Sequence, residues 1–210
     1  MGIGKRRLGT WLVIVGGLAC LVLFYLSLRP VFAPATEEQP GEEGVTFMGG
    51  RYEGWEGTRQ SWFLEAAEIF RSADERKITF RGIRRICFFQ EDGYDLVLKA
   101  ASATLDLRRN ILTLTGVEGE VGGGRLEAEQ IELDLDKKLV KSNLPLSFTK
   151  ESLMVQAARM EGNIQAGEYC FTGELGVAQK EHRIRGQSFV YQVKVDRFEI
   201  RGGVEVELTL

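Results

Sequence analysis

The sequence predicts an all-β domain of stacked, bent hairpins behind a single N-terminal transmembrane helix. Three observations lead to this prediction. A strand-rich unit recurs at near-constant spacing, the chain holds 25 glycines but only 4 prolines, and an uncharged stretch of 21 residues lies near its start. Glycine-rich, proline-poor composition fits a β protein with many tight turns. Stacked hairpins with a shared core form an elongated surface, which suits a long ligand better than a compact catalytic pocket.

The uncharged stretch covers residues 8–28. As a helix it would be about 31 Å long, which matches the hydrocarbon thickness of a bilayer. Lys5, Arg6 and Arg7 precede it and acidic residues follow it, so the short basic end is expected on the cytoplasmic side. We therefore predict a cytoplasmic tail (1–7), a transmembrane helix (8–28), a flexible linker (29–44) and a β domain across the membrane (45–210).

A cleaved signal peptide is the alternative to the anchor. Ala33-Pro34-Ala35 resembles a small-x-small cleavage site, and cleavage after Ala35 would release a soluble domain. The apolar stretch is longer than the roughly 7–15 residues of a signal core. Its length favours an uncleaved anchor.

The repeat begins with Leu98-Lys99-Ala100 and returns as Leu126-Glu127-Ala128, Val155-Gln156-Ala157 and Ile184-Arg185-Gly186. Apolar side chains before the small third residue sit at even offsets from it, whereas those after it begin three residues later. The inward–outward alternation therefore slips by one, which a strand can do only through a bulge or a bend. We expect each copy to bend sharply at the small residue, as strands do at the corners of a sandwich or jelly roll.

Other segments follow the same pattern less clearly. Residues 62–73 fit helical spacing as well as strand spacing, and their similarity to the repeat favours a strand. Turns are predicted at Glu91-Asp92-Gly93, Arg108-Arg109-Asn110, Asp136-Lys137-Lys138 and Gly122-Gly123-Gly124.

Charge excludes one class of partner. Residues 1–35 contain four basic residues and no acidic ones, so the rest of the chain holds 23 basic and 30 acidic residues. A domain of net charge −7 would repel a polyphosphate backbone, so we expect no nucleic-acid partner.

The sequence offers few candidate catalytic residues. His182 is the single histidine of the chain and stands among charged neighbours, as a solvated surface residue would. The sequence has no CxxC or His/Cys cluster for a metal. Cys87 and Cys170 could pair as a disulfide in an oxidising compartment or remain buried thiols. We predict no enzyme activity, no cofactor and no metal site.

Apolar strand positions are the remaining functional candidates. They could form an ordinary packed core, or two partly splayed sheets whose side chains contact acyl chains. The candidates for lining such a trough are Phe88, Leu98, Leu114, Leu133, Phe148, Val155, Phe171, Phe189 and Tyr191.

Several motifs, in this order and spacing, resemble the LptC family of lipopolysaccharide export proteins. They follow a short basic tail and a single anchor, and they extend over nearly the whole chain: Trp62-Phe63-Leu64-Glu65-Ala66, Asp92-Gly93-Tyr94-Asp95-Leu96-Val97-Leu98-Lys99-Ala100, Lys141-Ser142-Asn143-Leu144-Pro145-Leu146 and Val155-Gln156-Ala157-Ala158-Arg159-Met160. The chain departs from the family in its glycine-rich start near residues 49–57 and in Gly186, where earlier copies of the repeat have alanine.

The resemblance implies a periplasmic β-jellyroll tethered to the inner membrane by a single-pass anchor. Such a protein would receive lipopolysaccharide from an ABC transporter and pass it to an LptA-like periplasmic bridge protein. By resemblance, the N-terminal edge would face the transporter and the C-terminal edge the bridge protein. The candidate edge residues are Val45, Phe47, Val204, Val206 and Leu208. The alternative is a bitopic scaffold with a closed β domain and no lipid cargo.

Overall fold

The computed structural model describes residues 43–89, 96–180 and 182–208. The predicted tail, the transmembrane helix, nearly all of the linker and the turn at Glu91-Asp92-Gly93 lie outside these residues, and the predicted domain boundaries stay predictions. Among the described residues, no helix has the length and hydrophobicity needed to cross a bilayer. The residues from Glu43 onward form one compact unit.

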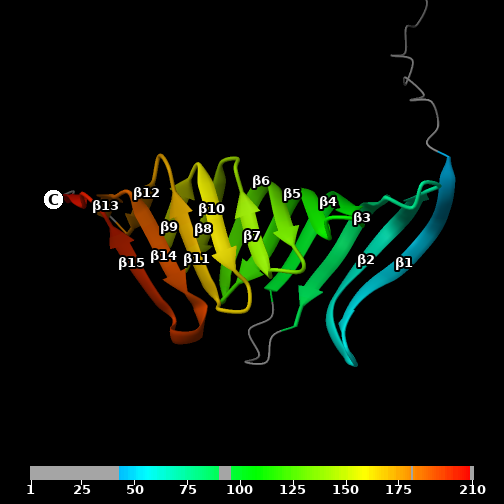
Figure 1. Cartoon of the computed structure of the whole chain (residues 1–210). Coiled ribbons are helices and arrows are strands. Elements are labelled where there is room, and N and C mark those ends of the chain that lie inside the picture. The colour runs from blue at the N-terminus through cyan, green and yellow to red at the C-terminus, as the bar shows by residue number, and fades with distance from the viewer. Residues whose placement is uncertain (1–42, 90–95, 181, 209–210) are drawn as a thin grey trace, which may run out of the picture. The chain divides into compact units, whose positions relative to one another are not determined.

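The described residues form one sheet of 16 antiparallel strands (Figure 1), which confirms the all-β prediction. Strand β2 covers the ambiguous segment at 62–73 almost completely, so the choice of strand over helix was correct. The elements are β1 (Gly44–Glu56), β2 (Arg59–Ser72), β3 (Lys77–Phe88), β4 (Leu96–Asp106), β5 (Ile111–Val121), β6 (Gly124–Asp134), β7 (Leu139–Ser142), β8 (Leu146–Lys150), β9 (Leu153–Ala157), β10 (Arg159–Asn163), β11 (Glu168–Thr172), β12 (Gly176–Gln179), β13 (His182–Arg185), β14 (Ser188–Gln192), the 3₁₀ turn η1 (Val193–Val195), β15 (Arg197–Arg201) and β16 (Glu205–Leu208).

The sheet forks at β6. Strands β1 to β6 are long and pair in sequence order. Residues 125–128 of β6 pair with β8, whereas residues 132–134 pair with β7. Beyond the fork, the sheet continues as layer A (β7-β10-β11-β14-β15) and layer B (β8-β9-β12-β13-β16). The first six strands pass from one layer into the other, which produces a jelly-roll-like sandwich.

A line of bends separates the two layers. The ladder between β3 and β4 pairs Ile83 with Ala100 and Arg81 with Ser102, and omits the residues between them. The β4–β5 and β5–β6 ladders omit the corresponding position. Farther along, the strands break completely: β9 ends at Ala157, and Gly186 lies between β13 and β14. The bends therefore fall at, or one residue beyond, the small third residue of each repeat, as the alternation predicts.

Glycine makes the bend possible in alternate strands. Gly82 and Gly116 both have left-handed backbones, with φ of 60° and 63°. A side chain on Gly116 would place its Cβ 3.2 Å from the Cβ of Ala101 on the next strand. The bend line therefore needs a small residue on one strand and glycine on its neighbour.

Candidate functional site

In the half of the sheet that ends in layer B, the apolar residues of the repeat belong to a continuous row on the inward face. Directly paired residues of antiparallel strands share a face. Following the pairing from β1 to β16, the row contains Tyr52, Leu64, Ile86, Leu98, Gly119, Leu126, Phe148, Val155, Val177, Ile184 and Val206. The four copies of the repeat contribute Leu98, Leu126, Val155 and Ile184, two strands apart each time. A step of 28 or 29 residues thus corresponds to one out-and-back hairpin.

A facing row lies in the half of the sheet that ends in layer A. It runs through Ile78, Leu105, Leu112, Leu133, Val140, Gly162, Tyr169, Tyr191 and Phe198. The two layers meet through aromatic rings: Phe148 of layer B lies 5.3 Å from Tyr191 and 5.7 Å from Phe171 of layer A, centroid to centroid. Phe171 continues to Phe189 at 5.7 Å.

All nine candidate lining residues belong to one buried cluster and are 0–3% exposed. The cluster includes Phe88, which stacks on Trp62 at 6.0 Å. The middle of the domain is therefore filled by side chains rather than held open. Contact of these residues with lipid stays a prediction.

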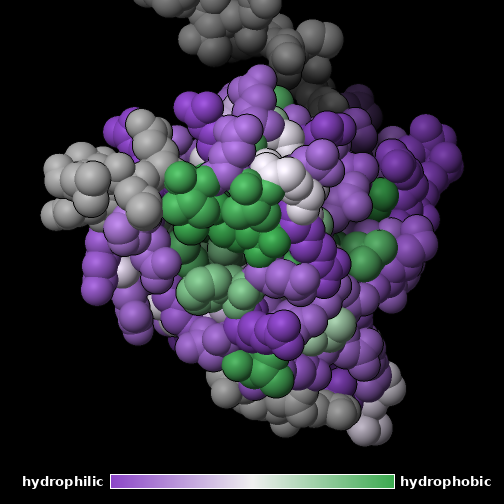
Figure 2. Space-filling model, turned by 90° about the vertical axis from the view of Figure 1, so that its left-hand side faces the viewer, coloured by the Kyte–Doolittle hydropathy of each residue, from purple (hydrophilic) through white to green (hydrophobic). Residues whose placement is uncertain are grey.

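Apolar side chains emerge from this core at both ends of the sheet. Among the described residues, β1 pairs only with β2, β15 only with β14, and β16 only with β13. The edge candidates Val45, Phe47, Val204 and Val206 are all more than half exposed. The backbone of Leu208, the fifth candidate, pairs with His182. Figure 2 shows the C-terminal end, where an apolar patch is surrounded by hydrophilic residues.

Opposite the bend line, the hairpin turns of the two layers approach each other and form the mouth of the sandwich. A polar cluster joins the layers there. The ammonium of Lys150, at the end of β8, donates to the carbonyl of Gly122 at 2.9 Å and to the Tyr191 hydroxyl at 2.8 Å, and it forms an ion pair with Asp196. The Tyr191 oxygen lies 2.9 Å from both the Gly122 carbonyl and the Asp196 carboxylate.

These contacts shift the ionisation of the cluster. The hydrogen bond from Lys150 lowers the pKa of Asp196, and the Tyr191 hydroxyl adds to this effect. Burial opposes the charge of Lys150, but its bonds to Asp196 and Tyr191 outweigh burial and raise the pKa of Lys150. At neutral pH the cluster is therefore a charged, hydrogen-bonded link between the layers.

A second polar contact crosses the mouth nearer the N-terminus. Glu56, at the end of β1, forms an ion pair with Lys138 in the β6–β7 turn, and Lys138 lowers the pKa of Glu56. The same turn is tied to the β4–β5 turn by a 2.6 Å hydrogen bond from Asn110 to Asp136. A pocket of about 290 Å³ lies at this contact and is lined by both layers. Its apolar lining is Tyr52, Trp55, Trp62, Leu105, Leu107 and Leu135, and its polar lining is Glu53, Glu56, Ser61, Asn110, Asp136 and Lys138.

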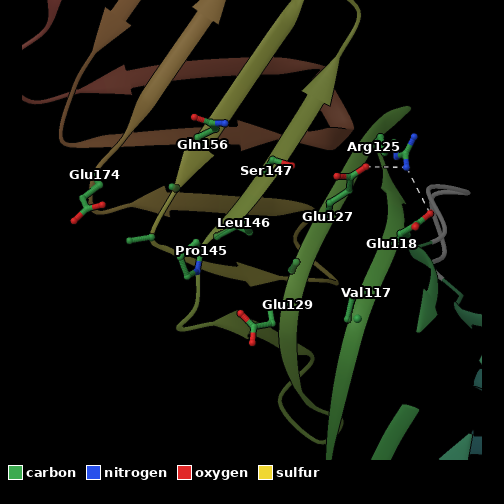
Figure 3. A pocket seen from close by; sticks show the side chains of 14 residues that line it. Val117, Glu118, Arg125, Glu127, Glu129, Pro145, Leu146, Ser147, Gln156 and Glu174 are labelled. Carbon is green, nitrogen blue, oxygen red and sulfur yellow. Dashed lines mark ion pairs between the residues drawn. The ribbon is translucent and has the colours of Figure 1, made fainter. Parts of the chain in front are cut away.

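A larger hollow of about 880 Å³ lies on the outer face instead (Figure 3). Its polar lining includes Glu118, Glu127, Ser147 and Gln156, which alternate along their strands with buried neighbours. Arg125 pairs with Glu127 at 2.8 Å and with Glu118 at 3.6 Å. Four buried members of the core cluster also line this hollow: Val117, Ala128, Leu146 and Ala157.

The residues considered for catalysis, disulfide formation or metal binding do not come together as a site among the described residues. His182 is exposed on β13. Cys87 and Cys170 do not form a disulfide, so that alternative is not realised. Within the described ranges, no three His, Cys, Asp or Glu side chains gather as a metal site.

Sequence reasoning missed the contacts across the mouth. Lys150 carried a signal, because it stands two residues after Phe148 on the inward face, where the alternation calls for an apolar side chain. Its partners lie 28 to 46 residues away in the chain, and nothing in the sequence pairs them.

A model of the family described as lipopolysaccharide-assembly, LptC-related, matches residues 17–171, about three quarters of the chain. This chain belongs to the LptC-related family. Membership confirms the resemblance, assigns the chain a role in lipopolysaccharide transport and supports the prediction that it is not an enzyme.

Solved structures similar to this LptC-related chain include LptH of Pseudomonas aeruginosa, described as the LptA homologous periplasmic component of the lipopolysaccharide transport device. LptH is 14% identical, with a TM-score of 0.46; the match covers 55% of this chain and 95% of LptH. Comparison with curated proteins gave no significant match.

Proposed function

We propose that this chain is a periplasmic lipopolysaccharide relay anchored in the inner membrane. It receives lipid from an ABC transporter and passes it through its apolar interior to an LptA-like bridge protein. Residues 8–28 serve as the single-pass anchor, with the basic N-terminus in the cytoplasm. The charge asymmetry around the anchor supports this orientation, and membership of the LptC-related family supports the lipid cargo.

The observation that carries the proposal is the pair of inward apolar rows. One row extends from β1 to β16 and the other from β3 to β15, and apolar side chains are exposed at both ends of the sheet. Burial of each acyl methylene contributes about 0.8 kcal/mol, so several acyl chains could be held without a strong polar site. Unpaired strand edges at both ends can accept a further strand from a neighbouring protein.

Photo-crosslinking in cells tests the cargo. A photoreactive amino acid at Phe148 or Phe189, both fully buried on inward faces, is expected to capture lipopolysaccharide. Glu132 is the matched control, because it is exposed on β6 next to inward Leu133. Capture at Glu132 alone would refute an interior path.

The packed core favours a second candidate, a scaffold that joins membrane proteins and carries no lipid. Its nine candidate lining residues are almost completely buried, as a dry core requires. A scaffold would capture partner proteins through its edges and no lipopolysaccharide from any inward position, so the same crosslinking separates the two functions.

The anchor has its own test. Mass spectrometry of the mature N-terminus is expected to find Met1 or Gly2. A mature chain beginning at Thr36 would mean cleavage after Ala35, release from the membrane and a soluble bridge rather than a tethered relay.

A further inference from the structure

Two of the polar contacts described across the mouth of the sandwich differ in the number of groups that take part. The C-terminal contact is the cluster of Lys150, Gly122, Tyr191 and Asp196. The Lys150 side chain is 15% exposed and makes three polar contacts, whereas the side chain of its partner Asp196 is 65% exposed. A buried charge with several hydrogen bonds is costly to separate from its partners.

The N-terminal contact is the ion pair of Glu56 and Lys138. The Glu56 side chain is 46% exposed and the Lys138 side chain is 23% exposed, so the contrast with the Lys150 cluster lies in the number of polar contacts rather than in exposure. An ion pair with such access to water adds little to stability. It can therefore open at small cost.

The space beneath the two contacts also differs. The N-terminal pair lies at the rim of the 290 Å³ pocket, whose lining includes Tyr52, Trp62, Leu105 and Leu107. Trp62 and Leu105 belong to the continuous core cluster. Beneath the C-terminal cluster, the rings of Phe148 and Tyr191 close the space at 5.3 Å. A pocket that reaches two residues of the core cluster thus coincides with the contact that has fewer partners.

From these differences we infer that the mouth is a side entrance. Acyl chains enter the interior laterally between Glu56 and Lys138, while the Lys150 cluster keeps the C-terminal half of the mouth closed. This inference rests on the proposed relay function. The class of cargo follows from the lining: apolar chains reach Trp62 and Leu105, and a polar head stays at the rim beside Glu56, Lys138 and Asp136.

The test locks the entrance in the full-length chain. Glu56→Cys and Lys138→Cys are introduced into a protein that already carries Cys20→Ser and Cys170→Ser, and a short bis-maleimide joins the two new cysteines. A photoreactive residue at Phe148 in the same protein reports lipid capture. The matched control is Lys141→Cys with Glu161→Cys. These residues pair across β7 and β10 within layer A, so their crosslink does not span the mouth.

Locking the mouth is expected to reduce lipopolysaccharide capture at Phe148 to the level seen at outward Glu132, whereas the control crosslink leaves capture unchanged. Equal capture in the two crosslinked proteins would overturn the side entrance and leave the relay intact. Absence of capture before any crosslinking would overturn both. An unchanged melting temperature of the locked protein shows that the fold survives the crosslink, and Glu56→Gln, which only breaks the pair, is expected to raise capture.

Discussion

Replacing Gly116 by alanine tests whether the bend line depends on glycine. Gly116 has φ of 63°, a conformation that costs an L-residue about 1–2 kcal/mol. The added Cβ would also lie 3.2 Å from that of Ala101, which is closer than ordinary van der Waals contact. We therefore expect Gly116→Ala to lower the free energy of unfolding by at least about 1–2 kcal/mol.

Thermal unfolding of the purified full-length protein, followed by far-UV circular dichroism, measures this effect. In a domain of this size each kcal/mol shifts the melting temperature by about 2–4 °C, so the expected decrease is about 2–8 °C. Gly176→Ala is the control. Gly176 also lies near a bend, at the start of β12, but it has no positive φ, and a Cβ added there would meet no atom within 4 Å. Its replacement should therefore be neutral or slightly stabilising.

A double variant separates the two causes. Ala101→Gly in the Gly116→Ala background removes the close contact but leaves the unfavourable φ, so it should restore only part of the lost stability. Equal melting temperatures for Gly116→Ala and the Gly176→Ala control would show that the sheet bends without help from glycine, and would refute this account of the repeat.

Three further predictions concern the interior, the edge and the mouth. Leu133→Asp places a carboxylate at a fully buried position and should either unfold the domain or block lipid export; normal growth with normal lipopolysaccharide at the cell surface would contradict an interior role. Val206→Pro removes a backbone donor from edge strand β16 and should reduce copurification with an LptA-like partner, whereas unchanged recovery would exclude this edge as the docking site. Lys150→Met should lower the melting temperature at neutral pH. The pKa of Asp196 is lowered and that of Lys150 is raised, so the cluster stabilises the fold while both groups are charged. The difference in melting temperature between Lys150→Met and wild type should therefore shrink as pH falls below about 4 or rises above about 10.5. A difference in melting temperature that does not depend on pH would mean that the cluster contributes no charge interaction.

The repeat was the strongest source of information in the sequence. A period of two fixes which side chains face inward, and the slip after Ala100, Ala128 and Ala157 fixes where each strand bends. The near-constant spacing predicted stacked hairpins with one shared core, and in the structure Leu98, Leu126 and Val155 share one row because successive copies lie two strands apart. These features follow from local geometry, and the structure contains them.

The fork at β6 and the contacts across the mouth could not be predicted in the same way. Residues 125–128 and 132–134 of β6 have similar patterns, yet they pair with different strands. The Lys150 cluster joins three separate hairpins, two through side chains and the third through the backbone carbonyl of Gly122. Its formation depends on how the layers are placed against each other, which residue alternation does not specify. Alternation also left open whether the apolar faces pack or splay, and the structure packs them.

A packed interior is compatible with a relay for a physical reason. An open, empty trough lined by the candidate residues would expose a large apolar patch to water, which monomeric soluble domains avoid. When acyl chains enter, they replace side-chain contacts with lipid contacts, so the apolar atoms stay out of water in both states.

The bend line and the mouth determine where such a change can occur. At the bend line the two layers are joined by the continuous backbones of β1 to β6. The polar links described at the mouth are those of Glu56 with Lys138 and of Lys150 with its partners. Separating the layers at the mouth breaks side-chain contacts and preserves the backbone ladders within each layer. The mouth is therefore the side at which the domain can open without unfolding, and the side at which a crosslink discriminates between a relay that opens and a scaffold that stays closed.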